Sequence, residues 1–374
     1  MMLLLLVLAF QDPPAVDPAK VDAALRRGVA WLQTNGAIPS APGDQLKPSP
    51  DPLGVKNGFA CRELVLFAMW HAGVRESDPF FAAAFRTMLE EPPAFTYRTA
   101  LQAMLLEAMD PAKYRDRILD CAQVLVDNQC ANGQWSYGTM TAPEVASPAA
   151  KKPAATKGAK PSVVKRRDGP KIGDNSNSQV AALGLRACRD AGIELPRAVL
   201  ERADAHWRTF RVGKAWNYGP GGPFHFRWVT GSMTAGAAGS LVVYDHLLDR
   251  DWSKDEEVAG AIAWLNDHWS VTANPRPTEG DPSSTVPDNS LYYLYGIERL
   301  GRLSGCDRLG AHDWYAEGAK AILDRQNSDG SWSWWPAQVG AGGKLLPFAD
   351  TCFAILFLTR GTKGLVPSTD LKKN

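Results

Sequence analysis

Two segments of the chain repeat the same pattern, and this repeat limits the fold more than any other feature of the sequence. Residues 122–135 and 319–332 each read as an amphipathic helix ending in Gln, then a short polar turn, then Gly-x-Trp. The Gly supplies the positive φ that ends a helix, and the Trp can fold back over the apolar seam beside the next helix. Weaker copies occupy residues 24–35, 203–218 and 258–269. Trp216 and Trp264 are 48 residues apart, a period that predicts one helical hairpin per repeat.

A second set of helices is expected between these copies, at residues 59–74, 95–109, 175–192, 231–248, 289–303 and 348–360. These segments are apolar on nearly all sides, which is typical of buried helices. Small residues such as Gly184, Gly236 and Gly239 would let neighbouring helices approach closely. With a weaker outer helix at 79–90, twelve helices alternate between outer and inner, and strand signals are poor. The predicted fold class is all-α, an (α/α)6 toroid of six helical hairpins with inner and outer helix layers.

Biased segments set the expected domain limits. Residues 1–18 read as either a signal peptide or a disordered N-terminus, because the apolar run 3–10 is too short for a membrane span of ~20 residues. Residues 19–365 form a single toroid, and 366–374 form a tail. Residues 141–170, rich in Ala, Pro, Lys and Ser, predict a disordered insert. Export to the periplasm or the medium is the expected localisation, with the cytoplasm as the alternative.

Charge and cysteine usage narrow the expected partners. The net charge is +1, which does not favour nucleic acid, and no segment predicts an integral membrane span. No CxxC and no Cys/His spacing of a zinc site occurs, so no metal and no cofactor are expected. The six cysteines read as buried thiols, and the sequence leaves open whether any of them pair: Cys61, Cys121, Cys130, Cys188, Cys306 and Cys352.

The Gln…Gly-x-Trp turns resemble the QW motif, the squalene cyclase repeat of squalene-hopene and oxidosqualene cyclases. The alternating helices also resemble the α/α toroid of protein prenyltransferase β subunits and complement thioester domains. The resemblance covers most of residues 20–360. It implies a terpenoid cyclase/prenyltransferase-type toroid with a central cavity for a hydrophobic, isoprenoid small molecule.

The catalytic signatures of these families are absent. No Asp-Asp dipeptide occurs, so the Asp-x-Asp-Asp acid of the cyclases is missing. Asp350-Thr-Cys352 fits half of the prenyltransferase zinc site, but the last histidine, His312, precedes it. The Gly-Cys-Gly-Glu-Gln segment of thioester domains is also absent. The specific reaction therefore stays unassigned.

Polar residues gather at the expected starts of the inner helices. In an α/α ring these helices run in one direction, so their N-termini meet at one mouth, where the helix dipoles favour anionic ligands. Any single Asp, Asn or Ser there could be an N-cap alone, but two Arg and a Glu exceed what capping needs. Aromatic residues Tyr292, Tyr293 and Tyr295 also cluster on one inner helix. The candidate acids and bases are Asp174, Asp288, Asp350 and Glu63, and the candidate binding residues are Arg62, Tyr97, Arg98, Asn175, Asn177, Ser232, Asn289 and Tyr292.

Three functions remain open from the sequence. A cyclase- or prenyltransferase-like enzyme, a lyase, isomerase or transferase if active, requires a concave site with perturbed carboxylates. A non-catalytic toroid that binds a ligand or a protein would have a wide or filled aromatic centre. A polysaccharide-processing toroid would use Tyr, Arg and His or paired acids across an open cleft, with a glycan as ligand. The sequence does not indicate an oligomeric state.

Overall fold

The structure, a computed structural model, describes residues 16–35, 61–138, 160–219, 228–276, 290–334 and 346–365. Within these ranges the chain forms twelve α-helices. It also forms a 3-10 helix, η2 (Trp252–Lys254), and a two-stranded antiparallel sheet of β1 (Arg308–Leu309) and β2 (His312–Asp313). The all-α prediction is confirmed.

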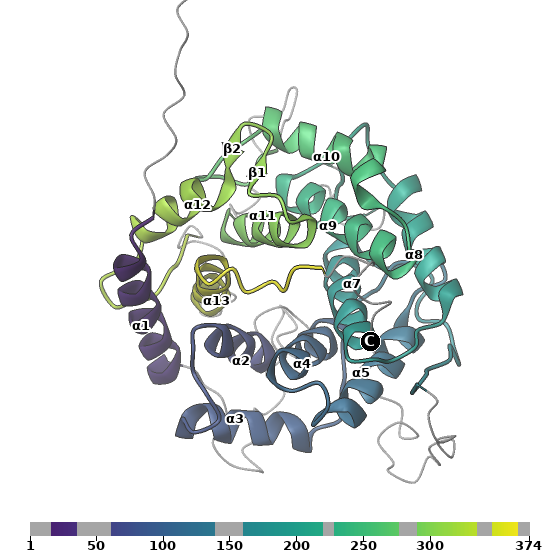
Figure 1. The fold of residues 1–374 in the computed structure, drawn as a ribbon, viewed down its shortest axis with the longest axis horizontal. Helices are drawn as coiled ribbons and strands as arrows, with labels where there is room; N and C mark the ends of the chain where they lie inside the picture. The colour runs from purple at the N-terminus through teal and green to yellow at the C-terminus, as the bar shows by residue number, and fades with distance from the viewer. Residues whose placement is uncertain are drawn as a thin grey trace, which may run out of the picture.

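Six helices form a closed inner ring, in which each helix contacts the next and α13 contacts α2 (Figure 1). They are α2 (Arg62–His71), α4 (Thr96–Met109), α7 (Asn175–Asp190), α9 (Gly231–Leu247), α11 (Ser290–Ser304) and α13 (Leu346–Leu358). Small residues allow the close packing of this ring. A Cβ added to Gly184 would lie 2.7 Å from the Cβ of Ala100 on α4, a separation that real side chains do not adopt.

Six further helices surround the inner ring as an outer layer (Figure 1). α3 packs on α2, α5 on α4 and α7, α8 and α10 on α9, and α12 on α11 and α13. α1 contacts both α12 and α13, so the first and last hairpins meet. The outer helices are α1 (Pro18–Asn35), α3 (Pro79–Glu90), α5 (Arg115–Asn128), α8 (Arg197–Thr209), α10 (Glu256–Asp267) and α12 (Trp314–Leu323). The architecture is the predicted (α/α)6 toroid.

The tryptophans of the repeated turn join the two layers. Trp135 and Trp332 are completely buried. Each indole Nε1 donates to a carbonyl of the preceding outer helix, at 2.7 Å for Trp135 to Leu125 and 2.8 Å for Trp332 to Ile322. Each tryptophan backbone N–H donates to a hydroxyl near the start of the following inner helix, at 2.9 Å to Ser178 and 3.0 Å to Thr351. The Trp therefore fixes the distance between the outer and inner helix of neighbouring hairpins.

The glutamine and glycine of the same turn hold the next outer helix. Gln129 Nε2 donates to the carbonyl of Val199 on α8 at 2.8 Å. In the last turn, Gln326 Nε2 donates to the carbonyl of Ala24 on α1 at 2.9 Å. Gly330 has a φ of 95°, and an added Cβ would lie 2.6 Å from the carbonyl oxygen of Arg27 on α1. The last turn therefore closes the outer layer on the first helix.

A short segment after α13 crosses the ring, and we call residues 361–365 the C-terminal strap. In Figure 1 it is the yellow trace that runs from α13 over the middle of the ring. The backbone N–H of Thr362 donates to Glu298 of α11 at 2.9 Å, and its hydroxyl bonds the same carboxyl at 2.6 Å. Lys363 forms an ion pair with Glu107 near the end of α4. The strap thus covers the end of the ring at which the inner helices end.

Part of the segment that includes the predicted insert packs against the helices. Residues 141–159 lie outside the described residues, but 160–170 pack on the C-terminal end of α5. Val163 is buried, Lys165 Nζ donates to the carbonyls of Val126 and Gln129 at 3.0 Å, and Arg166 pairs with the buried Asp127. The last carbonyls of a helix lack intrahelical partners, so basic side chains bind there even when their own segment has no apolar period.

In the described residues no helix is both long and apolar enough to cross a membrane. The proposed signal segment 1–18 and the tail 366–374 lie almost wholly outside the described residues.

Candidate functional site

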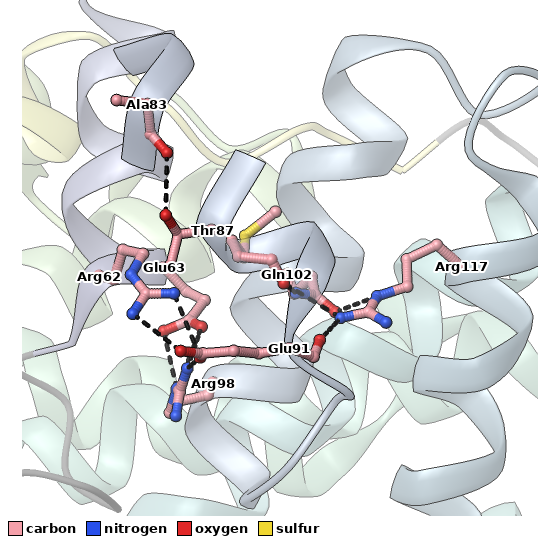
Figure 2. Close-up of polar contacts among 9 residues, drawn as sticks. Arg62, Glu63, Ala83, Thr87, Glu91, Arg98, Gln102 and Arg117 are labelled. Atoms are coloured by element: carbon pink, nitrogen blue, oxygen red, sulfur yellow. Dashed lines mark hydrogen bonds and ion pairs between the residues drawn. The ribbon is translucent and has the colours of Figure 1, made fainter. Parts of the chain in front are cut away.

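Three of the predicted site residues meet in one ion-pair network between α2 and α4 (Figure 2). Arg98 Nε and Nη2 donate to Glu63 at 3.0 and 2.9 Å, and Nη2 also donates to Glu91 at 2.8 Å. Arg62 Nη1 donates to the same Glu91 oxygen at 3.2 Å, and its Nη2 donates to the other carboxylate oxygen at 3.3 Å. Glu91, which follows α3, is the member of this network that sequence reasoning missed. Two guanidinium groups and two carboxylates balance, so the network ties hairpins together and leaves no net charge for a ligand.

Burial and ion pairing shift the pKa values of this network in opposite directions. Burial alone lowers the pKa of Arg98, but its pairing with Glu63 outweighs that effect and raises the pKa above its ordinary value. Burial raises the pKa of Glu91, but hydrogen bonds from Arg98 and Arg62 reverse this, and the pKa lies below its usual range. Arg117 of α5 extends the contacts by donating to Gln102 at 2.9 Å (Figure 2). The network joins α2, α4 and α5 with the loop after α3.

Asp174 is the N-cap of α7. Its carboxylate accepts the backbone N–H of Asn177 at 2.9 Å, the Asn177 amide at 2.6 Å and the hydroxyl of Ser176 at 2.5 Å. Burial raises the pKa of this carboxyl in spite of the three donors. Asn175 donates to the carbonyl of Asn217 at 2.8 Å. Asn175 and Asn177 are fully buried, and these contacts are those of a capped helix start.

Of the other predicted residues, some contact loops and some lie outside the described residues. Ser232 donates its backbone N–H to Asn274 at 2.8 Å and accepts from the same amide at 3.0 Å. The buried Asp350 accepts the backbone N–H of Trp334 at 2.8 Å. Asp288 and Asn289 lie outside the described residues.

The centre of the ring holds a second polar group, which we call the central cluster: Tyr97, Gln179, Tyr292, Tyr295 and Arg299. The hydroxyls of Tyr97 and Tyr292 are 3.2 Å apart, and Tyr97 donates to the carbonyl of Ser176 at 3.0 Å. Gln179 Nε2 donates to the Tyr292 hydroxyl at 2.5 Å, and Gln179 Oε1 accepts from Arg299 Nη2 at 2.6 Å. First turns of α4, α7 and α11 thus meet, as expected for inner helices that begin at one mouth.

Sequence reasoning singled out the three tyrosines of this cluster but missed Gln179 and Arg299. Burial raises the pKa of Tyr97, and the neighbouring Tyr292 and the charge of Asp174 raise it further. Burial likewise raises the pKa of Tyr292. The hydroxyls therefore stay protonated and available as donors at neutral pH. Tyr97 donates to the carbonyl of Ser176, and the hydroxyl of Ser176 donates to Asp174, so the Asp174 carboxyl lies at the helix start that Tyr97 contacts.

The central cavity is small. Its volume is about 10 Å³, roughly the space that one water molecule needs. Leu101, Met104 and Phe353 form part of an apolar wall, and Arg299 supplies the charged part of the lining. The predicted cavity is present at the centre of the ring, but side chains fill most of it.

Comparisons with known proteins add to this geometry. No protein-family profile matches the chain, and no curated protein matches its sequence. Among solved structures, the type II terpene cyclase MstE from Scytonema, in complex with its product merosterolic acid A, is similar. The TM-score is 0.50, with 12% sequence identity over 91% of this chain and 97% of that chain. The fold is terpenoid-cyclase-like. This likeness extends to the fold alone.

Proposed function

We propose that this chain is a terpene-cyclase-like toroid that binds a small, mainly apolar molecule of isoprenoid type at the centre of its inner ring. The observation that carries the proposal is the composition of that centre. Tyr97, Tyr292, Tyr295 and Phe353 present aromatic surfaces, and aliphatic side chains complete the wall. Small-molecule sites combine such apolar linings with a few fixed polar groups, and the central cluster supplies those groups.

The C-terminal strap covers the end at which the inner helices end, held by Glu298 and by Glu107. We propose that a ligand arrives from the opposite end, at which those helices begin and where Tyr97 and Tyr292 lie in the first turns of α4 and α11. The cavity must widen to admit it, and flexible side chains such as Met104 can move with little cost. The filled centre does not favour the polysaccharide alternative, whose site would be an open cleft for several sugar rings.

One observation favours catalysis in addition to binding. Asp174 is a carboxyl whose pKa is raised by burial, and it caps the start of α7, where Tyr97 donates to the carbonyl of Ser176. A carboxylic acid whose pKa is raised can, in its protonated form, donate a proton to an electron-rich double bond. Aromatic faces beside it would stabilise the resulting cation. We therefore propose Asp174 as the acid if the toroid is an enzyme.

The test uses the full chain with farnesol, geranylgeraniol, squalene and maltohexaose. Binding is followed by thermal shift and calorimetry, and products are sought by gas chromatography with mass spectrometry. We expect at least one isoprenoid to bind and maltohexaose not to bind. Asp174→Asn should retain binding and lose any product.

A matched pair of variants locates the site. Phe353→Leu and Phe81→Leu each shorten a buried aromatic side chain, but Phe353 lines the centre, whereas Phe81 contacts Trp70 and Phe85 outside it. We expect the first variant alone to change isoprenoid affinity, while both lose stability. Binding of no isoprenoid, or equal affinity changes in the two variants, would reject the proposed site.

A further inference from the structure

Arg299 is a buried cation without an acidic partner in the part of the chain that the structure describes. It is 4% exposed, and none of the described carboxylates lies within 4.0 Å of its guanidinium group. Arg186 on α7 is the natural comparison, because it is equally buried at 2% exposure but pairs with Asp190 at 2.9 Å. An arginine stays charged at any ordinary pH, so its charge cannot be removed by loss of a proton.

The neighbours of Arg299 compensate for only part of its desolvation. Gln179 Oε1 accepts one hydrogen bond at 2.6 Å, and the ring of Tyr295 lies 4.5 Å from the guanidinium carbon. Glu298 is adjacent in sequence, but its carboxyl is held by Thr362 of the strap at 2.9 and 2.6 Å. A buried ion without an opposite charge is strongly destabilising, so a fold that retains one is expected to use it.

The guanidinium group of Arg299 faces the central cavity. Arg299 lines that cavity, whose volume of about 10 Å³ leaves room for one water-sized atom or group. A planar guanidinium binds a carboxylate through two parallel hydrogen bonds. A single cation suits one negative charge rather than a diphosphate, and the cavity must widen to admit a carboxylate.

We propose that Arg299 is the binding residue for one monoanionic group at the centre of the ring. That group is either the carboxylate of an apolar acid or a free small anion. The first of these alternatives rests on the proposed function. In the first case the ligand is an isoprenoid acid rather than an alcohol or a hydrocarbon.

The experiment compares farnesoic acid with farnesol, which share one chain and differ in the head group. Affinities for the full chain are measured by calorimetry, and sodium formate is titrated at constant ionic strength with melting temperature as the readout. We expect the acid to bind at least about tenfold more tightly than the alcohol. Arg299→Met should abolish that preference, and Arg299→Lys, which keeps the charge, should restore part of it. Arg186→Met, which removes a buried arginine that already has an acid, should keep the preference.

The outcomes separate this inference from the proposed function. Equal binding of acid and alcohol, with no formate effect, would overturn the inference and leave the proposed function standing. Stabilisation by formate that is lost in Arg299→Met, with neither isoprenoid bound, would support a free-anion site and reject the proposed function. Loss of the acid preference in Arg186→Met to the same extent as in Arg299→Met would overturn the assignment to Arg299. Circular dichroism checks that each variant folds. If Arg299→Met does not fold, the comparison of acid and alcohol is made with Arg299→Lys instead.

Discussion

At the scale of single residues, two buried glutamates have different roles because they bind different partners. Glu63 lies against Arg98 and belongs to a charge-balanced network. Glu298 lies against an amide and a hydroxyl of the strap, and burial raises its pKa to about 7, although Arg299 and Arg302 act to lower it. One carboxyl ties two helices through charge, and the other holds the strap through hydrogen bonds.

Glu298 makes the stability of the molecule depend on pH. Because its folded pKa is raised from 4.5 to about 7, the fold prefers the protonated form. The stabilisation is complete below pH 4.5 and is lost as the pH rises through 7, on the order of 3 kcal/mol in total. Glu298→Gln imitates the protonated acid, so we expect it to match the wild type near pH 5 and to be more stable at pH 8.

Urea unfolding at both pH values measures this difference. Glu201→Gln is the matched control, because Glu201 is 53% exposed beside Arg197 and should alter the pH dependence little. Loss of stability at pH 8 in the Glu298→Gln variant would show that Glu298 acts as a buried anion.

The sequence predicted these roles unevenly. Arg62, Glu63 and Arg98 were expected to gather, and they do, but their partner Glu91 sits on a loop where no periodicity applies. Tyr97 and Tyr292 were expected near the mouth and meet at the centre. Gln179 and Arg299 were missed because each follows another polar residue, Ser178 or Glu298, and the sequence does not show which of them faces the centre. Only the closed ring shows that both face inward.

At the scale of elements, helices were predictable and irregular segments were not. The repeated Gln…Gly-x-Trp turn and the Ala/Gly-rich runs led to helix positions close to those observed. Residues 160–170 and the strap carry no period, yet both bind helix ends through Lys, Arg or Thr side chains and backbone groups. The composition of a segment indicates whether it can form a hydrophobic core of its own. It does not indicate whether another element provides hydrogen-bond or ion-pair partners for it.

Arg166 tests the attachment of the insert to α5. Its removal leaves the buried carboxylate of Asp127 with one backbone donor, at 2.9 Å. Because Arg166 is 42% exposed, we expect Arg166→Ala to cost about 2 kcal/mol, less than the ~3–5 kcal/mol of a fully buried pair. The neighbouring exposed Arg167 is the control, and Arg167→Ala should change stability by less than about 0.5 kcal/mol. Equal losses of stability in the two arginine variants would show that 160–170 do not bind α5 in solution.

Deletion of residues 141–159 should leave the melting temperature nearly unchanged.

At the scale of the whole molecule, the contact between the last turn and α1 defines the architecture. Gln326 bonds the carbonyl of Ala24, Trp31 Nε1 donates to Asp329 at 3.1 Å, and Gly330 lies against the backbone of Arg27. The fold class could be predicted because each hairpin carries its own signal. The closing contact was harder to predict from the sequence, because it joins a clear copy of the turn, at residues 319–332, to a weaker copy at residues 24–35.

Two glycine variants test the closing contact. Gly330→Ala and Gly73→Ala place a side chain at similar φ values, 95° and 92°, each at a cost of about 1 kcal/mol. Only at Gly330 would the new Cβ meet another helix, 2.6 Å from the carbonyl of Arg27, while nothing lies within 4 Å of Gly73. We expect hydrogen exchange of α1 amides to accelerate in Gly330→Ala alone. Unchanged exchange in α1 would show that this turn does not hold the first helix.

That contact also has a kinetic meaning. An open stack of hairpins has two bare faces, from which it can fray and on which folding can grow one unit at a time. The described helices leave no such face, since Gln326 and Ala24, 302 positions apart in sequence, must find each other before the final unit is satisfied. Bringing such distant segments together is slow. Once they have met, no hairpin can unzip from an end, and unfolding must begin by breaking open the circle.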